Sequence, residues 1–472
     1  MRKLSLCSWA VILPSAFGCN LLSSPGNPAT DLSAPSTTLA RPTESAQPDC
    51  SVVFPPPVRG GDADVIFANG TIITMDDANP SVEAVAVQGN KILAVGRIAD
   101  VFRHRGEATS VIDLEGRTLV PGFTDSHSHR IMKGIDGQYD LKSTMDESIA
   151  QGWTSLSEKY AGWDKMPRYL DLARQDNLRL RVNMYLPYNG ALGEDTGDWW
   201  KVYDQDQVIS PRWRIAGMKI FTGVSNDTKL LWTQDGLNAL LLARHREGWH
   251  LAIKTVSTET LEMILTALEN IEKTDPSIAN RRVTLEHALF LTPEQIARVK
   301  RLGVIPSIQT NMPGELVGER DIEELTAREP RGSAFPWRNL VSAGVTLAGG
   351  SSFPTFYVEE PGGAPFGSPV HLMYQAVTRV GNLGTRPEAW MLDQTLTAEQ
   401  ALRALTINAA YANFQDDVLG SLTPGKLADM VILSDNPLAV STPEINDIRV
   451  LMTMVDGQVE YCAPGYLPYS QP

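Results

Sequence analysis

Short apolar, β-branched segments separated by turn residues lie near both ends of the chain. On the N-terminal side they are ADVIFANGTIITM and EAVAVQGNKILAVG, and glycine-containing sequences at residues 69–70 and 88–90 predict hairpin turns within them. KLADMVILS and VLMTMVDGQVEYC repeat the pattern near the other end, with an Asp-Gly turn at residues 456–457. Neither group has enough strands to bury a face alone. We therefore expect one small β-sandwich domain assembled from residues 62–118 and 418–465.

The middle of the chain alternates short apolar segments with amphipathic stretches such as GLNALLLARHREG and TETLEMILTALENIEK. The apolar segments predict eight strands, at Leu119–Asp125, Trp153–Leu156, Leu178–Leu186, Ile215–Phe221, His250–Val256, Arg282–His287, Val304–Gln309 and Val345–Gly350. Eight strand–helix units in about 300 residues favour an α/β fold of the (β/α)8 TIM-barrel type over an open sheet. We expect this barrel to span residues 119–417, with its active site at the carboxyl ends of the strands.

The charge balance excludes some classes of partner. The 472 residues include 41 Lys+Arg against 55 Asp+Glu, a formal net charge of −14, and no basic cluster interrupts this acidic background. Nucleic acids and anionic membrane surfaces both require a basic patch on the protein. We expect a small-molecule substrate as the partner and no nucleic acid. The sequence leaves the oligomeric state open.

The N-terminus has the pattern of a targeting segment. A short basic start, MRK, precedes an apolar run too short to span a bilayer, so residues 1–18 read as a signal peptide. AFGC resembles a bacterial lipobox, in which Cys19 would carry a lipid, although Phe17 departs from that pattern. Residues 19–61 are rich in Pro, Ser and Thr and read as a disordered tether. We expect an exported protein, either an envelope lipoprotein whose only membrane contact is that lipid or a periplasmic or secreted form.

The chain has four cysteines, Cys7, Cys19, Cys50 and Cys462. Cys7 leaves with the signal peptide and Cys19 would be lipidated. Cys50 and Cys462 therefore remain either as a disulfide in an oxidising compartment or as two unrelated thiols.

Two histidines stand one residue apart in RTLVPGFTDSHSHR, residues 117–130, where an apolar strand runs into a loop. Residues i and i+2 of a strand point the same way, so the imidazoles of His127 and His129 can converge on one metal ion. The same spacing also arises by accident, and the pair alone does not decide between a metal site and ordinary polar residues. On the barrel map, Lys219 and His287 join them at the carboxyl ends of two further strands.

Several longer segments carry a family resemblance. VPGFTDSHSH, GMKIF, RRVTLEHALFLTPEQIARVKRLGVIPSIQ, FPWRNLVSAGVTLAGGSS and LTINAAYANFQDDVLGSLTPGKLADMVIL resemble the amidohydrolase superfamily, nearest its N-substituted-formamide-deformylase-like branch. The resemblance spans about residues 62–461. It implies a metal-dependent barrel hydrolase with a small β-sandwich.

The resemblance also implies roles for particular residues. His127, His129, Lys219 and His287 match the metal ligands, and Lys219 matches a lysine that carbon dioxide carboxylates to bridge two ions. The expected cofactor is a divalent metal, with zinc as the leading candidate. Such an ion lowers the pKa of its bound water from 15.7 to about 7 and polarises the carbonyl under attack.

Two positions depart from the family. The strand-five histidine falls on Lys254, and the strand-eight aspartate that accepts the water's proton falls on Ser352. A protonated lysine cannot bind a cation, and losing a general base costs on the order of 10²–10⁴ in rate. His250 cannot replace the missing ligand, because four strand residues place it about 13 Å down the barrel.

Other polar and aromatic residues near the site are less strongly indicated as catalytic, metal-binding or substrate-binding residues. Glu359 and Glu360 in the following loop are conceivable substitutes for the lost carboxylate. Asp125 is expected to orient the backbone or a histidine rather than to bind metal. The aromatic pair at residues 199–200 either lines a substrate pocket or caps a loop.

The remaining histidines that we single out, His104, His245 and His371, are expected to be solvated on surface helices or loops. Only about 20 residues separate His129 from the second strand, where this branch usually carries a long insertion, so we expect an open mouth.

These observations favour an exported metal-dependent hydrolase that cleaves a non-peptide carbon–nitrogen bond, in an amide or cyclic amide, through metal-bound hydroxide. Lys219, Ser352 and Lys254 occupy its catalytic positions. The alternative is a catalytically degraded barrel that binds a small molecule or a protein as an envelope-anchored lipoprotein. The histidine pair, Lys219 and the Glu286-His287 pair favour the hydrolase, whereas Lys254 and Ser352 favour the alternative.

Overall fold

The structure is a computed structural model that describes residues 61–175, 179–224, 227–316, 326–330, 332–353, 367–381 and 384–466. The expected signal peptide, the tether and the first three cysteines lie outside the described residues, as do Glu359 and Glu360. Among the helices that are described, none combines the length and the apolar composition that a bilayer crossing requires.

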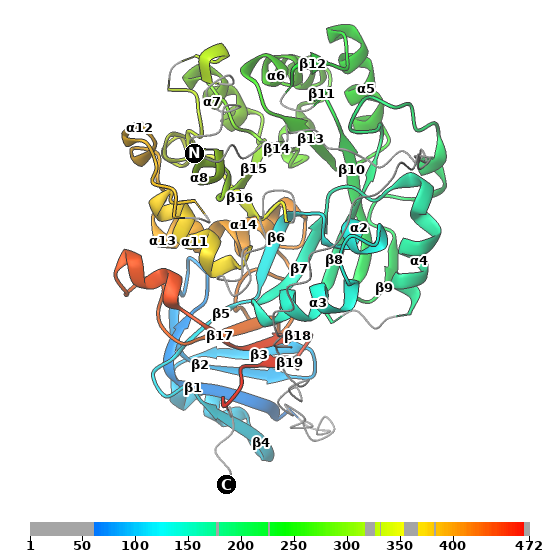
Figure 1. Cartoon of the computed structure of the whole chain (residues 1–472). Helices are drawn as coiled ribbons and strands as arrows, with labels where there is room; N and C mark the ends of the chain where they lie inside the picture. The colour runs from blue at the N-terminus through cyan, green and yellow to red at the C-terminus, as the bar shows by residue number, and fades with distance from the viewer. Residues whose placement is uncertain are drawn as a thin grey trace, which may run out of the picture. The chain divides into compact units, whose positions relative to one another are not determined.

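Eight parallel strands form the larger sheet (Figure 1). In sheet order they are β6 (Phe123–Ser128), β7 (Trp153–Glu158), β8 (Arg181–Pro187), β10 (Trp213–Ile220), β13 (Leu251–Thr255), β14 (Thr284–His287), β15 (Ile305–Gln309) and β16 (Ala348–Gly350). A short antiparallel strand, β9 (Val208–Ser210), pairs with β10. Backbone hydrogen bonds then join the two edges, from Ser352 N to the His127 carbonyl (2.7 Å) and from His129 N to the Phe353 carbonyl (2.9 Å). The sheet is therefore a nearly closed barrel, which confirms the expected fold class.

Helices surround the barrel strands (Figure 1). They are α2 (Arg130–Ile135), α3 (Leu141–Ala150), α4 (Met166–Arg174), α5 (Gln234–Arg246), α6 (Thr258–Glu272), α7 (Pro293–Arg301), α8 (Met312–Leu316), α10 (Trp337–Ser342), α11 (Pro369–Thr378), α12 (Ala389–Leu392), α13 (Ala398–Ala404) and α14 (Ile407–Ala412). α6 shows why these segments are helical. Its buried residues Leu261, Ile264 and Leu268 recur every three or four positions, and the Ser257 side chain caps its first turn by accepting a hydrogen bond from Thr260 N.

The smaller sheet contains both ends of the described chain. Its order is β19 (Gln458–Cys462), β18 (Val450–Val455), β17 (Met430–Leu433), β5 (Thr118–Pro121), β1 (Ala63–Ile73), β2 (Ser81–Gln88) and β3 (Lys91–Gly96), with β4 (Arg105–Asp113) also beside β1. The two halves meet where β5 and β17 pair antiparallel. Phe67 and Val85 from one half share a core with Met430 and Met452 from the other. The short helix α1 (Ile98–Val101) contributes Val101 to a second apolar cluster with β1 and β2.

Two predicted features of this region were wrong in detail. The Asn69-Gly70 pair is not a hairpin turn but a bulge inside β1, with Asn69 at φ 63°. A side chain at position 70 would collide with Leu114 and with the Arg117 carbonyl, so the glycine permits close packing there. The strand expected at 119–125 is divided at Gly122 between β5 of the smaller sheet and β6 of the barrel.

Cys462 is buried at the end of β19. We predict that it forms a disulfide with Cys50, because the other two cysteines leave or are modified in an exported chain. Non-reducing peptide mapping of exported protein should detect a linked pair of peptides that separates after reduction. Two alkylatable thiols in the same material would contradict the prediction.

Candidate metal centre

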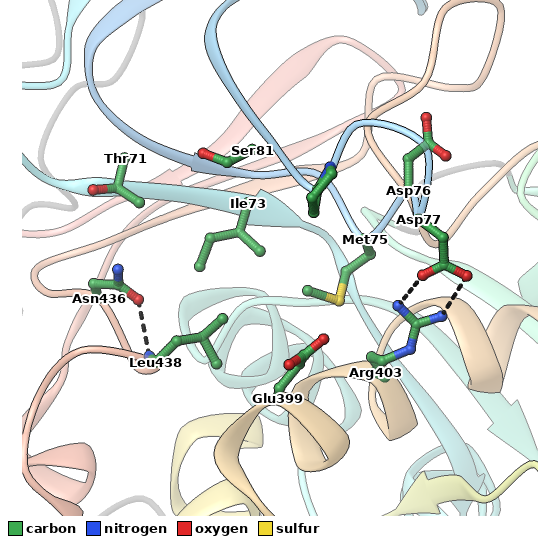
Figure 2. A pocket seen from close by; sticks show the side chains of 11 residues that line it. Thr71, Ile73, Met75, Asp76, Asp77, Ser81, Glu399, Arg403, Asn436 and Leu438 are labelled. Atoms are coloured by element: carbon green, nitrogen blue, oxygen red, sulfur yellow. Dashed lines mark hydrogen bonds and ion pairs between the residues drawn. The ribbon is translucent and has the colours of Figure 1, made fainter.

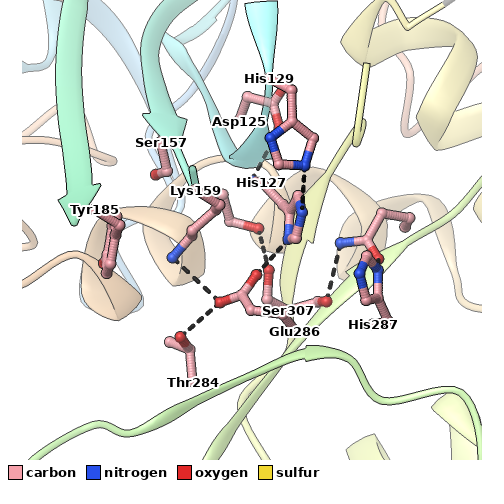
Figure 3. A network of polar contacts seen from close by, with 12 residues as sticks. Asp125, His127, His129, Ser157, Lys159, Tyr185, Thr284, Glu286, His287 and Ser307 are labelled. Carbon is pink, nitrogen blue, oxygen red and sulfur yellow. Dashed lines mark hydrogen bonds and ion pairs between the residues drawn. The ribbon is translucent and has the colours of Figure 1, made fainter. Parts of the chain in front are cut away.

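The predicted histidines meet at the carboxyl end of the barrel (Figure 3). His127 is the fifth residue of β6, and His129 follows that strand as the residue before α2. Their ring centroids lie 5.0 Å apart, and the His287 ring, at the end of β14, lies 4.8 Å from that of His127. Lys219 in β10 is buried, and its charge acts on all three rings. The structure therefore brings together all four residues that the resemblance singled out.

His127 is oriented by a buried carboxylate. Its Nδ1 contacts Glu286, which also forms an ion pair with Lys159 Nζ (3.2 Å) and accepts a hydrogen bond from Thr284 Oγ1 (2.7 Å). Burial opposes the charge on Glu286, but Lys159, Lys219 and His127 hold the pKa of that carboxyl well below its usual range. An ionised Glu286 needs a proton on His127 Nδ1. His127 Nε2 then keeps its lone pair and faces the site.

His129 completes a pair of ring nitrogens. Its Nε2 lies 3.2 Å from His127 Nε2, and its Nδ1 lies 3.6 Å from Glu158 Oε1. The other oxygen of Glu158 accepts hydrogen bonds from the backbone N–H groups of Ile131 (2.9 Å) and Met132 (3.3 Å). Burial raises the pKa of Glu158 to about 8 despite these bonds. Each histidine thus has a glutamate behind its Nδ1.

The two Nε2 atoms fit a single divalent cation. Zinc–nitrogen bonds of 2.0–2.1 Å at a tetrahedral angle place two ligand nitrogens roughly 3.3 Å apart, close to the observed 3.2 Å. Burial lowers the pKa of both histidines to about 3, so both imidazoles are neutral, as ligands must be. Within the described ranges, no group of three or more His, Cys, Asp and Glu side chains is arranged to hold an ion. Lys219, whose charge acts on both rings, and His287, whose ring lies 4.8 Å from that of His127, are the candidates for a further ligand.

Lys219 carries a buried amine with a lowered pKa. Burial and the neighbouring Lys159 and Lys254 lower its pKa to about 7, although Glu286 opposes the shift. Its ammonium nitrogen lies 5.5 Å from the centre of the Phe221 ring. A neutral amine can act as a ligand or react with carbon dioxide, which a protonated amine cannot do.

His287 makes a different set of contacts. Its Nδ1 pairs with Gln309 Oε1 at 2.8 Å, and its backbone takes a positive φ of 78°. Both features fix the ring beside His127 at an interplanar angle of 42°. The ring is close enough to line the site.

Lys254 belongs to a buried ion pair. Its Nζ lies 2.7 Å from Asp227 Oδ1, and Asp227 Oδ2 accepts hydrogen bonds from Val256 N (2.7 Å), Ser257 N (3.0 Å) and Thr260 Oγ1 (2.6 Å). Burial opposes the charge of Asp227, but Lys254 and these donors lower its pKa. At the strand-five position, the Lys254 ammonium is therefore held in an ion pair and does not act as a metal ligand.

The strand-eight position is also built without a carboxylate. Ser352 is buried with φ 52°, and its N–H donates to the His127 carbonyl. Asp125, one of the residues considered as a ligand, accepts hydrogen bonds from His127 N (3.1 Å), Arg130 Nη1 (2.6 Å) and Ser351 Oγ (2.5 Å). These bonds give Asp125 the orienting role that the sequence favoured.

Several residues expected at the surface are buried. His245 pairs with Asp275 through its Nε2 (2.7 Å), and His371 pairs with Asn446 through its Nδ1 (2.7 Å), so the expectation of solvated side chains was wrong for both. Each faces inward on an outer helix, where a polar partner satisfies its ring. His104 is half-buried.

The remaining aromatic and histidine candidates have structural roles. Trp200 is buried against Trp249, with the Arg244 guanidinium 4.3 Å from its ring centre. This supports the loop-capping interpretation of the pair Trp199–Trp200. His250 stacks on Phe414 at a centroid distance of 3.7 Å and bonds Gln205, so it does not join the histidine cluster.

Sequence reasoning missed three residues of the site. Glu158 and Lys159 lie just beyond the strand predicted to end at Leu156. The observed strand runs two residues further, to Glu158, and Lys159 follows it directly at the barrel's active end. Asp227 lies in the segment between β10 and α5, where no sequence pattern predicted its contact with Lys254.

A separate cleft of about 480 Å³ is lined by loops of the smaller sheet and by α13 (Figure 2). Asp77 and Arg403 form an ion pair across it at 2.8 Å, beside the apolar side chains of Ile73, Met75 and Leu438. None of the predicted site residues lines this cleft.

Comparison with known proteins identifies the family of this chain. The model of the amidohydrolase family matches residues 140–461. The protein LONG AFTER FAR-RED 3 of Arabidopsis thaliana is 23% identical over 86% of this chain and 93% of its own length. N-substituted formamide deformylase of Arthrobacter pascens is 28% identical over 50% of this chain and 40% of its own length.

Solved structures share the fold. A metal-dependent hydrolase from Pyrococcus furiosus has a TM-score of 0.63 at 17% identity, covering 79% of this chain and 99% of its own. Atrazine chlorohydrolase from Arthrobacter aurescens, solved with zinc, has a TM-score of 0.58 at 18% identity, covering 84% of this chain and 96% of its own. The family match extends over more than half of the sequence, and the chain belongs to the amidohydrolase family.

Proposed function

We propose that this protein hydrolyses a non-peptide carbon–nitrogen bond, in an amide or a cyclic amide, with one divalent ion held by His127 and His129. The observation that carries the proposal is the 3.2 Å separation of the two Nε2 atoms, each on a ring with a glutamate behind it. Zinc is the ion we expect. Lys219, as the amine or its carbamate, and His287 are the further groups that we expect to bind the ion.

When bound, the ion would supply Lewis-acid polarisation of the substrate carbonyl and a lowered pKa for an attacking water. The chain's own residues hold the geometry. Glu286 fixes the proton of His127 on Nδ1, Asp125 ties the His127 backbone to Arg130, and the Lys254–Asp227 pair closes the strand-five side. Ser352 offers a hydroxyl but no carboxylate for proton transfer. We therefore infer slower turnover than in a site with a general base.

The substrate class rests on relatives of this chain. N-substituted formamide deformylase and imidazolonepropionase, by their names, act on a formamide and on a cyclic amide. Purified protein reloaded with zinc should release amine or ring-opened product from a panel of N-substituted formamides and cyclic amides. Chelation should abolish this activity and zinc should restore it. Metal-loaded protein that turns over neither class would refute the proposal.

Restoring the family's residue types at positions 254 and 352 should increase both metal binding and activity. The double change Lys254→His with Ser352→Asp returns one ligand and one general base, and a base contributes typically 10²–10⁴ in rate. We expect bound metal to rise towards two equivalents and amide hydrolysis to rise at least tenfold. Asp227 loses its cationic partner in this variant, so Lys254→Met with Ser352 unchanged is the matched control for that loss. An inert double variant beside an active wild type would show that Lys254 and Ser352 are working parts.

A binding function is the second candidate, and a specific observation favours it. The buried Lys254–Asp227 pair and the serine at 352 leave the strand-five and strand-eight positions of the site without a ligand or a base. A barrel of this kind would bind a small molecule or a protein at the cell envelope without turning it over. Saturable binding of a panel amide with no product formed, in metal-loaded protein, would favour this candidate.

The proposal includes export to the cell envelope or periplasm. This part rests on the sequence of the first 61 residues, with its short apolar segment and the cysteine at position 19. The expected partner is a small molecule, and the acidic net charge of −14 disfavours nucleic acid.

A further inference from the structure

Three aromatic side chains gather at the carboxyl end of the barrel strands. Tyr160 is the second residue after β7, Trp163 follows in the same loop, and Phe221 is the first residue after β10. The Tyr160 ring lies 5.6 Å from the Phe221 ring and 6.3 Å from the Trp163 ring, measured between centroids, and both contacts are edge to face. We call these three residues the aromatic wall.

The aromatic wall stands next to the candidate metal centre. Residues i and i+2 point the same way along a strand, and each of two wall residues lies two positions beyond a side chain of the site. Phe221 follows Lys219 in this way, and Lys219 Nζ lies 5.5 Å from the centre of the Phe221 ring. Tyr160 follows Glu158, whose Oε1 lies 3.6 Å from His129 Nδ1. A substrate held at the histidine pair would therefore have the wall beside it.

Buried hydrogen bonds hold the backbone of the wall in place. The buried side chain of Asn189 accepts a hydrogen bond from Phe221 N (3.0 Å) and donates one to the Phe221 carbonyl (3.1 Å). Trp232 Nε1 donates a second hydrogen bond to that carbonyl (2.8 Å). Phe221 is thus fixed on both sides of its Cα atom, and its ring is positioned before any ligand binds.

Core packing does not account for the aromatic wall. Its three side chains are half-buried, and none of them belongs to the apolar clusters that the described residues form in the barrel or in the smaller sheet. Ligand sites combine aromatic surface with a few polar groups that orient the ligand. Aromatic side chains that keep part of their surface exposed beside such polar groups favour an apolar part of a ligand.

The charges near the wall narrow the class of ligand. The carboxylates of Asp136, Asp164 and Glu194 act electrostatically on the Tyr160 phenol. A ligand group with a negative charge would be repelled by them, and one with a positive charge would be repelled by the ion expected at the histidine pair. An uncharged apolar group fits both sides.

We propose that the substrate is an amide with an uncharged aromatic ring as a substituent, and that this ring lies against Tyr160, Trp163 and Phe221. The inference rests on the proposed function and names the class of its substrate. The ring gains edge and face contacts with the wall, while the carbon–nitrogen bond lies at the histidine pair. The wall residues select the substrate and take no part in bond cleavage.

Two formamides that differ only by a ring test the inference. N-(2-phenylethyl)formamide and N-ethylformamide share the amide and its two-carbon chain. For zinc-loaded wild-type protein, we expect kcat/KM to be at least about tenfold higher for the compound with the ring, mainly through a lower KM. Tyr160→Ala and Phe221→Ala should each reduce this ratio to about threefold or less. Trp390→Ala removes an exposed ring on α12 and is the matched control, which should keep the wild-type ratio.

Calorimetric binding of the same two formamides separates this inference from the proposed function. If zinc-loaded wild type hydrolyses neither formamides nor cyclic amides, the proposed function is refuted, whereas ring-dependent binding that Phe221→Ala loses would still support the wall. Equal binding and equal turnover of the two formamides by wild type would overturn the inference. A ring preference that survives in both alanine variants would also overturn it. Phe221→Leu, which keeps an apolar side chain, should lower the ratio as well and replaces Phe221→Ala if that variant does not fold.

Discussion

Replacing His127 by alanine should remove the tightly bound metal and reduce amide hydrolysis by roughly 10³-fold or more. The residue supplies one of the two Nε2 atoms that lie 3.2 Å apart, and without it His129 is left as the sole imidazole of the pair. Lewis-acid activation contributes several kcal/mol to such reactions, and each 1.36 kcal/mol corresponds to a factor of ten in rate. Elemental analysis and steady-state rates on the same preparation measure the two effects together.

His250→Ala is the matched control for this variant. His250 is a largely buried histidine of the same barrel, but it stacks on Phe414 and bonds Gln205 away from the histidine cluster. Its replacement should lower stability without changing the metal content. An unchanged metal content in His127→Ala would show that the ion binds elsewhere.

Replacing Asp227 by alanine should lower the free energy of unfolding by about 3–5 kcal/mol, because it leaves the ammonium of Lys254 buried without a counter-ion. The same change removes the acceptor for Val256 N, Ser257 N and the Thr260 hydroxyl at the start of α6. Denaturant unfolding of the two proteins gives the difference.

Two further variants identify the cause. Asp198→Ala, which removes an exposed pair with Lys201, should cost no more than about 1 kcal/mol. Adding Lys254→Met to Asp227→Ala should recover part of the lost stability, since the unpaired charge is then gone. If the double variant is as unstable as the sum of the single ones, the buried charge is not the cause.

The barrel could be predicted from sequence because its strands are buried on both sides. Such strands read as continuous apolar runs, and all eight predicted segments overlap an observed barrel strand. The division at Gly122 was missed, because Leu119–Asp125 was interpreted as one strand across Pro121 and Gly122. The glycine is required there only by the close approach of Thr154, which is a tertiary contact.

The approach of His127 to His129 could be predicted for the same reason, since a strand fixes which residues point together. The residues that contact and orient these site residues could not be predicted. Glu158 and Lys159 follow the last apolar residue of β7, where the pattern no longer signals a strand. Asp227 reaches Lys254 from 27 residues away, through a loop whose course no local sequence pattern specifies. His245 and His371 appeared to be surface residues because the polar partners that allow their burial are distant in sequence.

The count of tightly bound metal ions tests the central claim most directly. His127 and His129 provide one site, and the Lys254–Asp227 ion pair fills the position from which a second ion would draw a ligand. Purified full-length protein, stripped with a chelator, reloaded with excess zinc and then desalted, should retain one equivalent of zinc per chain by elemental analysis. Retention of no zinc, or of two equivalents, would contradict this account.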